Sequence, residues 1–357
     1  MGKALSFDEG ALPREIQCIF SSFSQLMKLI SIYFLISMTI DGNVELDLVR
    51  NTRELGSASP VVRPRIIYRT ACPANASVGD VEAFSDHLGI HLLIDLRSEE
   101  EQEEDDENGA LAGSITVDHL WRRSKKNSRA LEATVTVTDK TGSKSNTKRG
   151  TPPFIRHRLS LLDRKRFYRA LLGKLPKLVV AKALFISIYD GQASKDLFLD
   201  EINKGGLELL YEIILETSQP EILETLKLIT TTAETGNGVL FYCKAGKDRT
   251  GLLAMLILGL LGATESEIVA DFTKSDKHQQ VALGGMEKRP ELKRLKREIF
   301  ARAPPEAMRH TLRWLHERYQ SSGRDSFVAY CNEIGFNPTW QKRLTLALKA
   351  DQDKNDG

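Results

Sequence analysis

The chain has 357 residues, of which 41% are apolar and 27% charged, with a formal net charge of +2. This length and composition can bury a full core, so we expect one moderately large α/β domain with tails. The near-neutral charge and the lack of basic patches interleaved with aromatic residues exclude nucleic acid as an expected partner. Four widely separated cysteines and seven scattered histidines give no metal-ligand spacing. They indicate a reducing, cytoplasmic location and no metal or other cofactor.

Residues 1–45 are predicted to be a tail outside the domain. Positions 26–38 are apolar but are interrupted by Lys28, and the stretch is too short to span a bilayer. Acidic residues precede it, which argues against a signal peptide. Two interpretations stay open for this stretch: a tail or helix beside the domain, which we favour, and a segment in contact with a membrane.

The domain itself is expected over residues 46–348, with a first buried strand at 92–94. Residues 99–107 are acidic except for Gln102, a pattern more typical of a solvated helix or loop than of an interaction surface. Residues 122–150 are rich in Lys, Arg, Ser and Thr. We therefore expect a mobile insertion over about 99–150.

The next stretches are predicted to be mainly helical. Residues 156–169 carry six Arg or Lys around apolar positions, which predicts a basic amphipathic helix, either on the plain surface or near a functional site. Helical periodicity over 206–216 and 222–232 predicts two helices that Pro220 separates. Further helices are expected at 310–319 and 337–349, before a polar C-terminal tail at 349–357.

The run Gly238–Tyr242 reads as a buried strand, and residues 252–261 read as a buried helix. Strands and helices in this order predict a central, mostly parallel sheet flanked by helices. Between this strand and this helix lie the nine residues that hold most of the chemical information: Cys243, Lys244, Ala245, Gly246, Lys247, Asp248, Arg249, Thr250 and Gly251.

This loop is predicted to bind a phosphate group above a nucleophilic thiol. Backbone N–H groups at the start of a helix attract anions and favour the thiolate form of Cys243. Arg249 can grip two phosphoryl oxygens with its planar fork. Gly246 and Gly251 permit a tight backbone, while the Thr250 hydroxyl is expected to donate to the Cys243 sulfur. A buried structural cysteine is the alternative, but such a turn has no need of four charged side chains.

The spacing Cys-x5-Arg-Thr-Gly resembles the loop of the cysteine-dependent protein tyrosine phosphatases. The fuller loop is similar to that of the atypical subfamily that includes a secreted mycobacterial tyrosine and lipid phosphatase. The resemblance covers roughly residues 46–348 and implies a tyrosine-phosphatase-like fold with a catalytic strand, loop and helix. Upstream and downstream blocks support it at 51–56, 67–71, 88–99 and 268–275. One departure is Tyr242, where the family usually has His.

Other tyrosine phosphatases carry an acidic residue on a separate loop beside Trp and Pro, and no Trp-Pro-Asp occurs here. The resemblance implies that Asp248 protonates the leaving group instead, and it must then carry a proton when substrate binds. A helix-start role is the alternative for Asp248. Other candidate acids are Asp95, Asp163 and Asp190.

The leading hypothesis is metal-independent hydrolysis of phosphate monoesters through a cysteinyl-phosphate intermediate. Cys243 attacks, Arg249 clamps the phosphoryl group, and the remaining loop residues named above bind substrate. Protein phosphotyrosine, with dual specificity left open, is the favoured substrate. Phosphoinositide is the alternative because Lys244 and Lys247 add cations to the loop. A pseudophosphatase scaffold is less favoured since the chain keeps both Cys243 and Arg249, and a sulfurtransferase would not need this loop.

Overall fold

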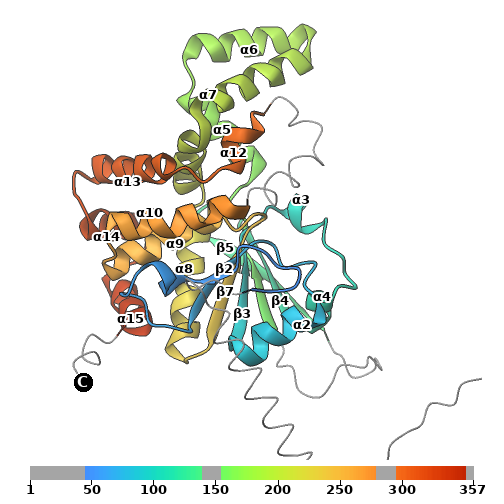
Figure 1. The fold of residues 1–357 in the computed structure, drawn as a ribbon. Coiled ribbons are helices and arrows are strands. Elements are labelled where there is room, and N and C mark those ends of the chain that lie inside the picture. Colours follow the sequence, from blue (N-terminus) through green and yellow to red (C-terminus); the bar gives the residue numbers. More distant parts are fainter. Residues whose placement is uncertain (1–44, 139–153, 279–294, 351–357) are drawn as a thin grey trace, which may run out of the picture.

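The computed structural model describes residues 45–138, 154–278 and 295–350 (Figure 1). Its strands are β1 Arg53–Glu54, β2 Ile67–Thr70, β3 Ile90–Asp95, β4 Ile115–Arg123, β5 Leu131–Val137, β6 Phe154–Arg158 and β7 Gly238–Tyr242. They form one sheet in the order β1-β2-β7-β3-β6-β4-β5. The five inner strands are parallel, and only the edge strands β1 and β5 run antiparallel to their neighbours. The predicted mostly parallel sheet is confirmed.

Helices connect and cover these strands. The shorter ones are η3 Leu55–Ala58, α2 Val78–Glu82, η4 Ala83–His87, α3 Glu99–Gln102, α4 Ala110–Ser114, η5 Lys274–His278 and α12 Arg297–Ala301. The longer ones are α5 Arg164–Lys174, α6 Lys177–Tyr189, α7 Gly191–Thr217, α8 Gln219–Glu234, α9 Asp248–Leu261, α10 Glu265–Thr273, α13 Pro305–Tyr319, α14 Arg324–Glu333 and α15 Pro338–Leu348.

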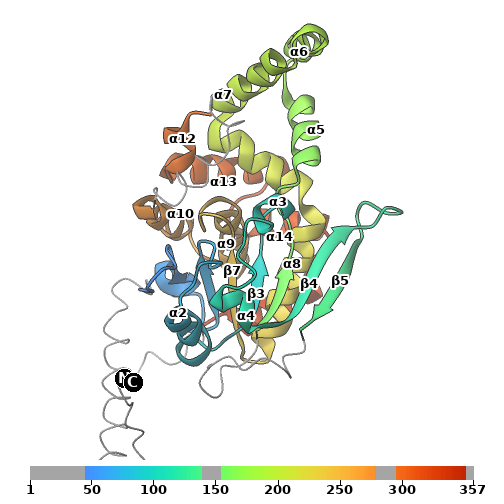
Figure 2. The same ribbon diagram turned by 90° about the vertical axis from the view of Figure 1, so that its right-hand side faces the viewer.

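The two faces of the sheet bury side chains in separate cores. On β7, Val239 and Phe241 point into a large core that includes the apolar side of α9. The alternate residues, Leu240 and Tyr242, point into a smaller core beside α2 and α4. Figures 1 and 2 show the thick helical layer of α8, α9, α13, α14 and α15 on the first face. Because β7 is central and its alternate side chains are buried on both faces, the strand is held rigidly up to its last residue.

The predicted elements around the loop are confirmed. The strands at 92–94 and 238–242 and the helix at 252–261 are present, as are the two helices that meet at Pro220, which sits in the first turn of α8. The predicted C-terminal helices correspond to α13 and α15. The apolar stretch at 26–38 lies outside the described residues.

Two sequence predictions differ from the structure. Of the mobile insertion expected over about 99–150, residues 99–138 form α3, α4 and the β4–β5 hairpin, whereas residues 139–150 lie outside the described residues. The polar residues of this hairpin pair with one another's backbones, so they need little apolar surface to be ordered. The basic helix predicted over 156–169 is also wrong in its first part. Residues up to Arg158 belong to β6, where Arg156 and Arg158 pair with Asp118 of β4, and α5 begins only after its cap, Asp163.

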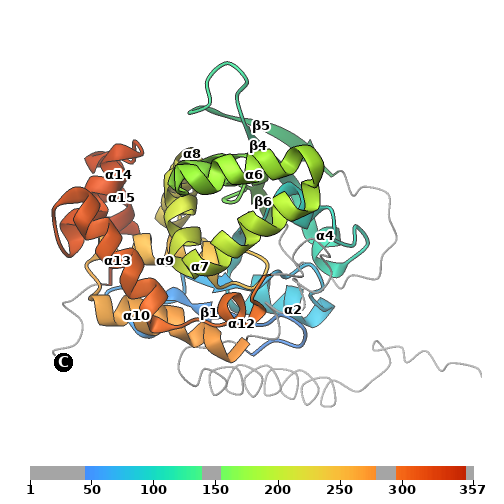
Figure 3. The ribbon, with the colours of Figure 1, turned by 90° about the horizontal axis from the view of Figure 1, so that it is seen from above.

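The α6 and α7 helices extend beyond the carboxyl edge of the sheet (Figure 1), so in the view from above they lie nearest to the viewer (Figure 3). They pack against each other, and the Ser194 hydroxyl donates to the Ala183 carbonyl between them. At Gly206 the backbone of α7 takes a positive φ of 57°, which turns the second half of the helix back toward the domain. That second half carries Tyr211 to the loop. Within the described part of the chain, no helix is long and apolar enough to cross a membrane.

Candidate active site

The predicted loop lies where β7 ends and α9 begins. Cys243 directly follows the strand and is only 1% exposed. Lys247 is the residue that precedes α9, so Asp248 and Arg249 belong to the first turn of that helix. The loop residues therefore face the positive end of the α9 dipole, as the sequence predicts.

The loop carbonyls point away from the centre of the loop and are held there. The Lys244 carbonyl accepts from the Cys72 amide at 3.1 Å, and the Ala245 and Gly246 carbonyls accept from the Asn51 side-chain amide at 2.9 and 3.1 Å. In a trans peptide the N–H points opposite to the carbonyl of the same unit. The N–H groups of residues 245–247 are consequently turned toward the opposite side, where they can bind an anion.

A buried ionic network supports this arrangement from below. Arg69 donates to the carbonyls of Gly246 and Lys247 at 2.8 and 3.3 Å, and it also pairs with the carboxylate of Asp271. Arg53 pairs with the other Asp271 oxygen at 2.9 Å. Burial alone would raise the pKa of Asp271, but the two guanidinium groups outweigh it and the pKa is lowered. Burial, followed by repulsion from Arg53, lowers the pKa of Arg69 to about 10.

The two loop glycines have different roles. Gly246 has a φ of +64°, and a Cβ there would lie 2.4 Å from the Thr70 carbonyl oxygen. Only glycine fits this position, since both the conformation and the close approach of β2 exclude a side chain. At Gly251 an added Cβ would meet the Phe272 ring at 3.1 Å, so this glycine allows α10 to pack close to α9.

Arg249 holds a carboxylate of the chain itself. Its two terminal nitrogens donate to the two oxygens of Glu101 on α3, one of them at 2.9 Å. Burial alone would lower the pKa of Arg249, but Glu101 outweighs it and the pKa is raised. Next to it, Lys244 pairs with Glu104 at 2.6 Å. The acidic run, interpreted from sequence as solvated, thus reaches the loop.

Asp248 is placed by a residue that the sequence reasoning missed. The Tyr211 hydroxyl, fully buried on α7, donates to Asp248 Oδ1 at 2.6 Å. Burial, and then the Asp248 carboxylate, raise the pKa of Tyr211 well above its ordinary value, so it remains a donor. Lys247 Nζ lies 3.1 Å from the same oxygen, and Lys247 also donates to the carbonyls of Phe300 and Arg302 at 2.6 and 2.7 Å.

The other candidate acids are engaged elsewhere. Asp95 is buried and pairs with Arg97 at 2.7 Å. Asp163 caps α5 by accepting from the Arg166 amide, and Asp190 caps α7. Among the described residues, Asp248 is therefore the candidate that lies in the loop and has a hydrogen bond that orients it.

Thr250 does not make its predicted bond. Its hydroxyl is buried and has no hydrogen-bond partner among the described residues, so the expected contact with the Cys243 sulfur is not formed. Tyr242, which stands where His was expected, is buried on the opposite face, where the Arg97 guanidinium lies 5.6 Å from its ring centre. Over the residues that the structure covers, no cluster of three or more His, Cys, Asp or Glu is arranged to hold a metal.

A mostly parallel sheet with a tight loop between its central strand and a buried helix is the arrangement typical of α/β proteins that bind phosphate groups. The model of the tyrosine phosphatase family matches residues 44–350. The chain belongs to the tyrosine phosphatase family.

Relatives with short aligned segments agree with this assignment. A Cupriavidus necator protein, provisionally named a tyrosine-protein phosphatase, is 42% identical over 59 residues, 15% of this chain and 22% of that protein. A tyrosine-protein phosphatase of Nostoc commune is 43% identical over 58 residues, 16% of this chain and 19% of that protein. The chain thus aligns with about a fifth of the length of these relatives. The narrower resemblance to the mycobacterial subfamily stays a prediction.

Proposed function

We propose that the protein hydrolyses phosphotyrosine in proteins through a cysteinyl-phosphate intermediate. The observation that carries this proposal is the bidentate hydrogen bonding of Arg249 to a carboxylate, beside a loop whose N–H groups face inward. A carboxylate presents two oxygens much as a phosphoryl group does. The Arg249 guanidinium is therefore already oriented to bind an oxyanion.

In this mechanism the Cys243 thiolate attacks phosphorus, an S–P bond forms, and the bond from phosphorus to the tyrosine oxygen breaks. Asp248 gives its proton to the departing phenolate and then removes one from the water that hydrolyses the S–P bond. Arg249 and the loop N–H groups stabilise the charge on the equatorial oxygens. The hydrogen bond from the Tyr211 hydroxyl holds the Asp248 carboxyl in one orientation.

The lysine contacts favour a protein substrate over a phosphoinositide. Lys247 is 1% exposed and its ammonium group is held by two carbonyls and Asp248, so it has a structural role. Lys244 is paired with Glu104. An inositol ring with several phosphates would meet the carboxylates of the acidic run rather than free cations, and like charges repel.

The test compares purified protein on phosphotyrosine peptides, phosphoserine peptides and phosphoinositide vesicles, with Cys243→Ser as the inactive control. We expect kcat/KM to be highest for phosphotyrosine and turnover to be lost in the control. Equal or greater kcat/KM on phosphoinositide would refute the substrate assignment. Turnover by Cys243→Ser at the native rate would refute the covalent mechanism.

A further inference from the structure

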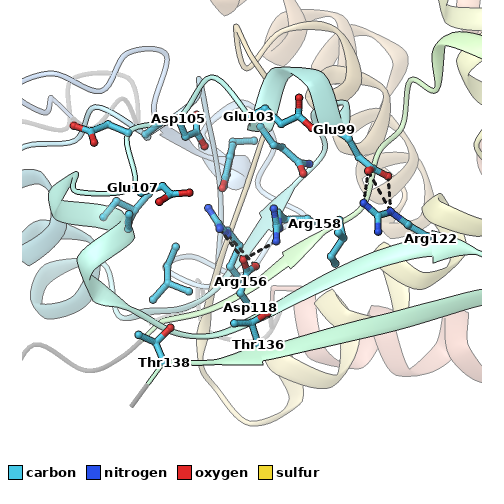
Figure 4. Close-up of a pocket in the computed structure, with 18 residues that line it drawn as sticks. Glu99, Glu103, Asp105, Glu107, Asp118, Arg122, Thr136, Thr138, Arg156 and Arg158 are labelled. Atoms are coloured by element: carbon cyan, nitrogen blue, oxygen red, sulfur yellow. Dashed lines mark hydrogen bonds and ion pairs between the residues drawn. The ribbon is translucent and has the colours of Figure 1, made fainter. Parts of the chain in front are cut away.

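A cleft of about 410 Å³ lies beside the catalytic loop, on the sheet face that carries α2 and α4 (Figure 4). Its floor is made by polar side chains of β6 and β4, including Arg156, Arg158 and Asp118. Residues of the segment 99–107 form the opposite wall. Tyr242, the residue before Cys243, also lines the cleft, whereas the loop that follows does not.

The floor of the cleft is polar because the Asp118 carboxylate forms ion pairs with the guanidinium groups of both Arg156 and Arg158. Asp118 lies 2.7 Å from Arg156 and 3.0 Å from Arg158. These charged side chains point to the same face as Tyr242, where a strand in a dry core would carry apolar residues. This part of the sheet is consequently built to face a polar occupant.

The wall of the cleft carries excess negative charge. Six carboxylates line the cleft against three guanidinium groups. Glu99, Asp105 and Asp118 are paired with arginines, whereas Glu103 and Glu107 are exposed and have no ion pair with any described cation. Figure 4 shows these two glutamates on the side of the cleft that faces Arg156 and Arg158.

We propose that this cleft binds a Lys- or Arg-bearing segment of the protein substrate, adjacent to the phosphotyrosine; the proposal rests on the proposed function. The substrate cation lies against the carboxylates of Glu103 and Glu107. The cleft and the loop share one wall, because Glu101 contacts Arg249 while the next residue, Gln102, lines the cleft. Consecutive Cα atoms are about 3.8 Å apart, so one short peptide can reach both.

The first experiment measures binding without chemistry. A fluorescent, unphosphorylated Arg-rich peptide is titrated with the full chain, and a neutral peptide of equal length serves as reference. We expect Glu103→Gln/Glu107→Gln to weaken binding of the basic peptide about 3–10-fold, as for the loss of two partly exposed charge contacts. The matched control is Glu306→Gln/Glu317→Gln on α13, which removes the same charge away from the cleft. Equal weakening in both variants, or binding of the neutral peptide at least as tight as that of the basic one, would overturn the proposal.

The second experiment measures kcat/KM on phosphotyrosine peptides with basic or neutral flanks. We expect Glu103→Gln/Glu107→Gln to lower the ratio of kcat/KM for the basic peptide to kcat/KM for the neutral peptide, by the same factor as binding. In the native protein, added salt should lower this ratio. If no phosphotyrosine peptide is hydrolysed at all, the proposed function fails while the binding result still decides the cleft. If turnover is normal and the ratio does not change, the cleft proposal alone is wrong.

Discussion

Removing the charge of Asp271 tests whether the buried network beneath the loop holds the site together. Asp271→Asn keeps the shape of the side chain but leaves Arg53 and Arg69 without their shared carboxylate. Breaking a buried ion pair from one side costs about 3–5 kcal/mol. The asparagine amide would also point an N–H group at one arginine. We therefore expect the free energy of unfolding to fall by at least about 3 kcal/mol.

The assay is urea unfolding followed by fluorescence, with Glu234→Gln as the matched control. Glu234 pairs with Arg343 through two hydrogen bonds of 2.7 and 2.6 Å, the same kind of fork, but at the surface. Removing this exposed pair should cost less than about 1 kcal/mol. If Asp271→Asn and Glu234→Gln lose similar stability, burial does not strengthen the network and our reasoning is wrong.

The pH dependence has a definite sign. The pKa of Asp271 is lower in the folded chain than its ordinary value. Its stabilising contribution is therefore complete above the unfolded value of about 4 and is lost as the pH falls through the folded value. When the pH is lowered below about 4, the free energy of unfolding should fall more for the native protein than for Asp271→Asn.

Four further results are expected. Cys243→Ser should abolish turnover but still bind substrate, because a hydroxyl is a poor nucleophile at neutral pH and the loop N–H groups are unchanged; isothermal titration with a phosphotyrosine peptide checks this, and loss of binding would contradict it. Asp248→Asn should slow the hydrolysis of aryl phosphates with poor leaving groups far more than of those with good ones. Tyr211→Phe should show the same dependence of rate on leaving-group pKa, but a weaker one. An equal loss of rate for all leaving groups would mean that Asp248 only shapes the loop. Gly246→Ala should lower kcat/KM at least about tenfold and lower the Tm, since its Cβ would meet the Thr70 carbonyl; unchanged kinetics would refute the strained turn. Activity should persist in EDTA, and inhibition that one added metal reverses would indicate another catalytic class.

The sequence was sufficient for the parts of the site that follow one another in the chain. Gly238–Tyr242, the loop and the start of α9 are contiguous, and their hydrophobic pattern is strong, so both the elements and their order could be predicted. The prediction for residues 156–169 failed because a count of basic residues does not distinguish a helix from a strand with alternating Arg. Only the pairing of β6 with β4 places Asp118 opposite Arg156 and within reach of the Arg158 side chain.

Contacts between distant segments could not be predicted in the same way. The acidic run follows β3 and the loop follows β7, and these strands are neighbours in the sheet. Their carboxyl ends therefore bring Glu101 to Arg249, but strand order is not written in local periodicity. Tyr211 gave no signal for a related reason, since its position in a buried helix is typical of a core residue.

Because Arg249 pairs with Glu101, any anion that binds this guanidinium must first displace the Glu101 carboxylate. A free inorganic phosphate can offset this displacement only through the contacts that its own oxygens make. A phosphotyrosine side chain brings its ring and its peptide, whose additional contacts can offset that displacement. Under the proposed function, the exchange is reversed after turnover, when Glu101 pairs with the guanidinium again and helps to release the product. Under the same proposed function, this exchange favours a phosphotyrosine side chain over small oxyanions.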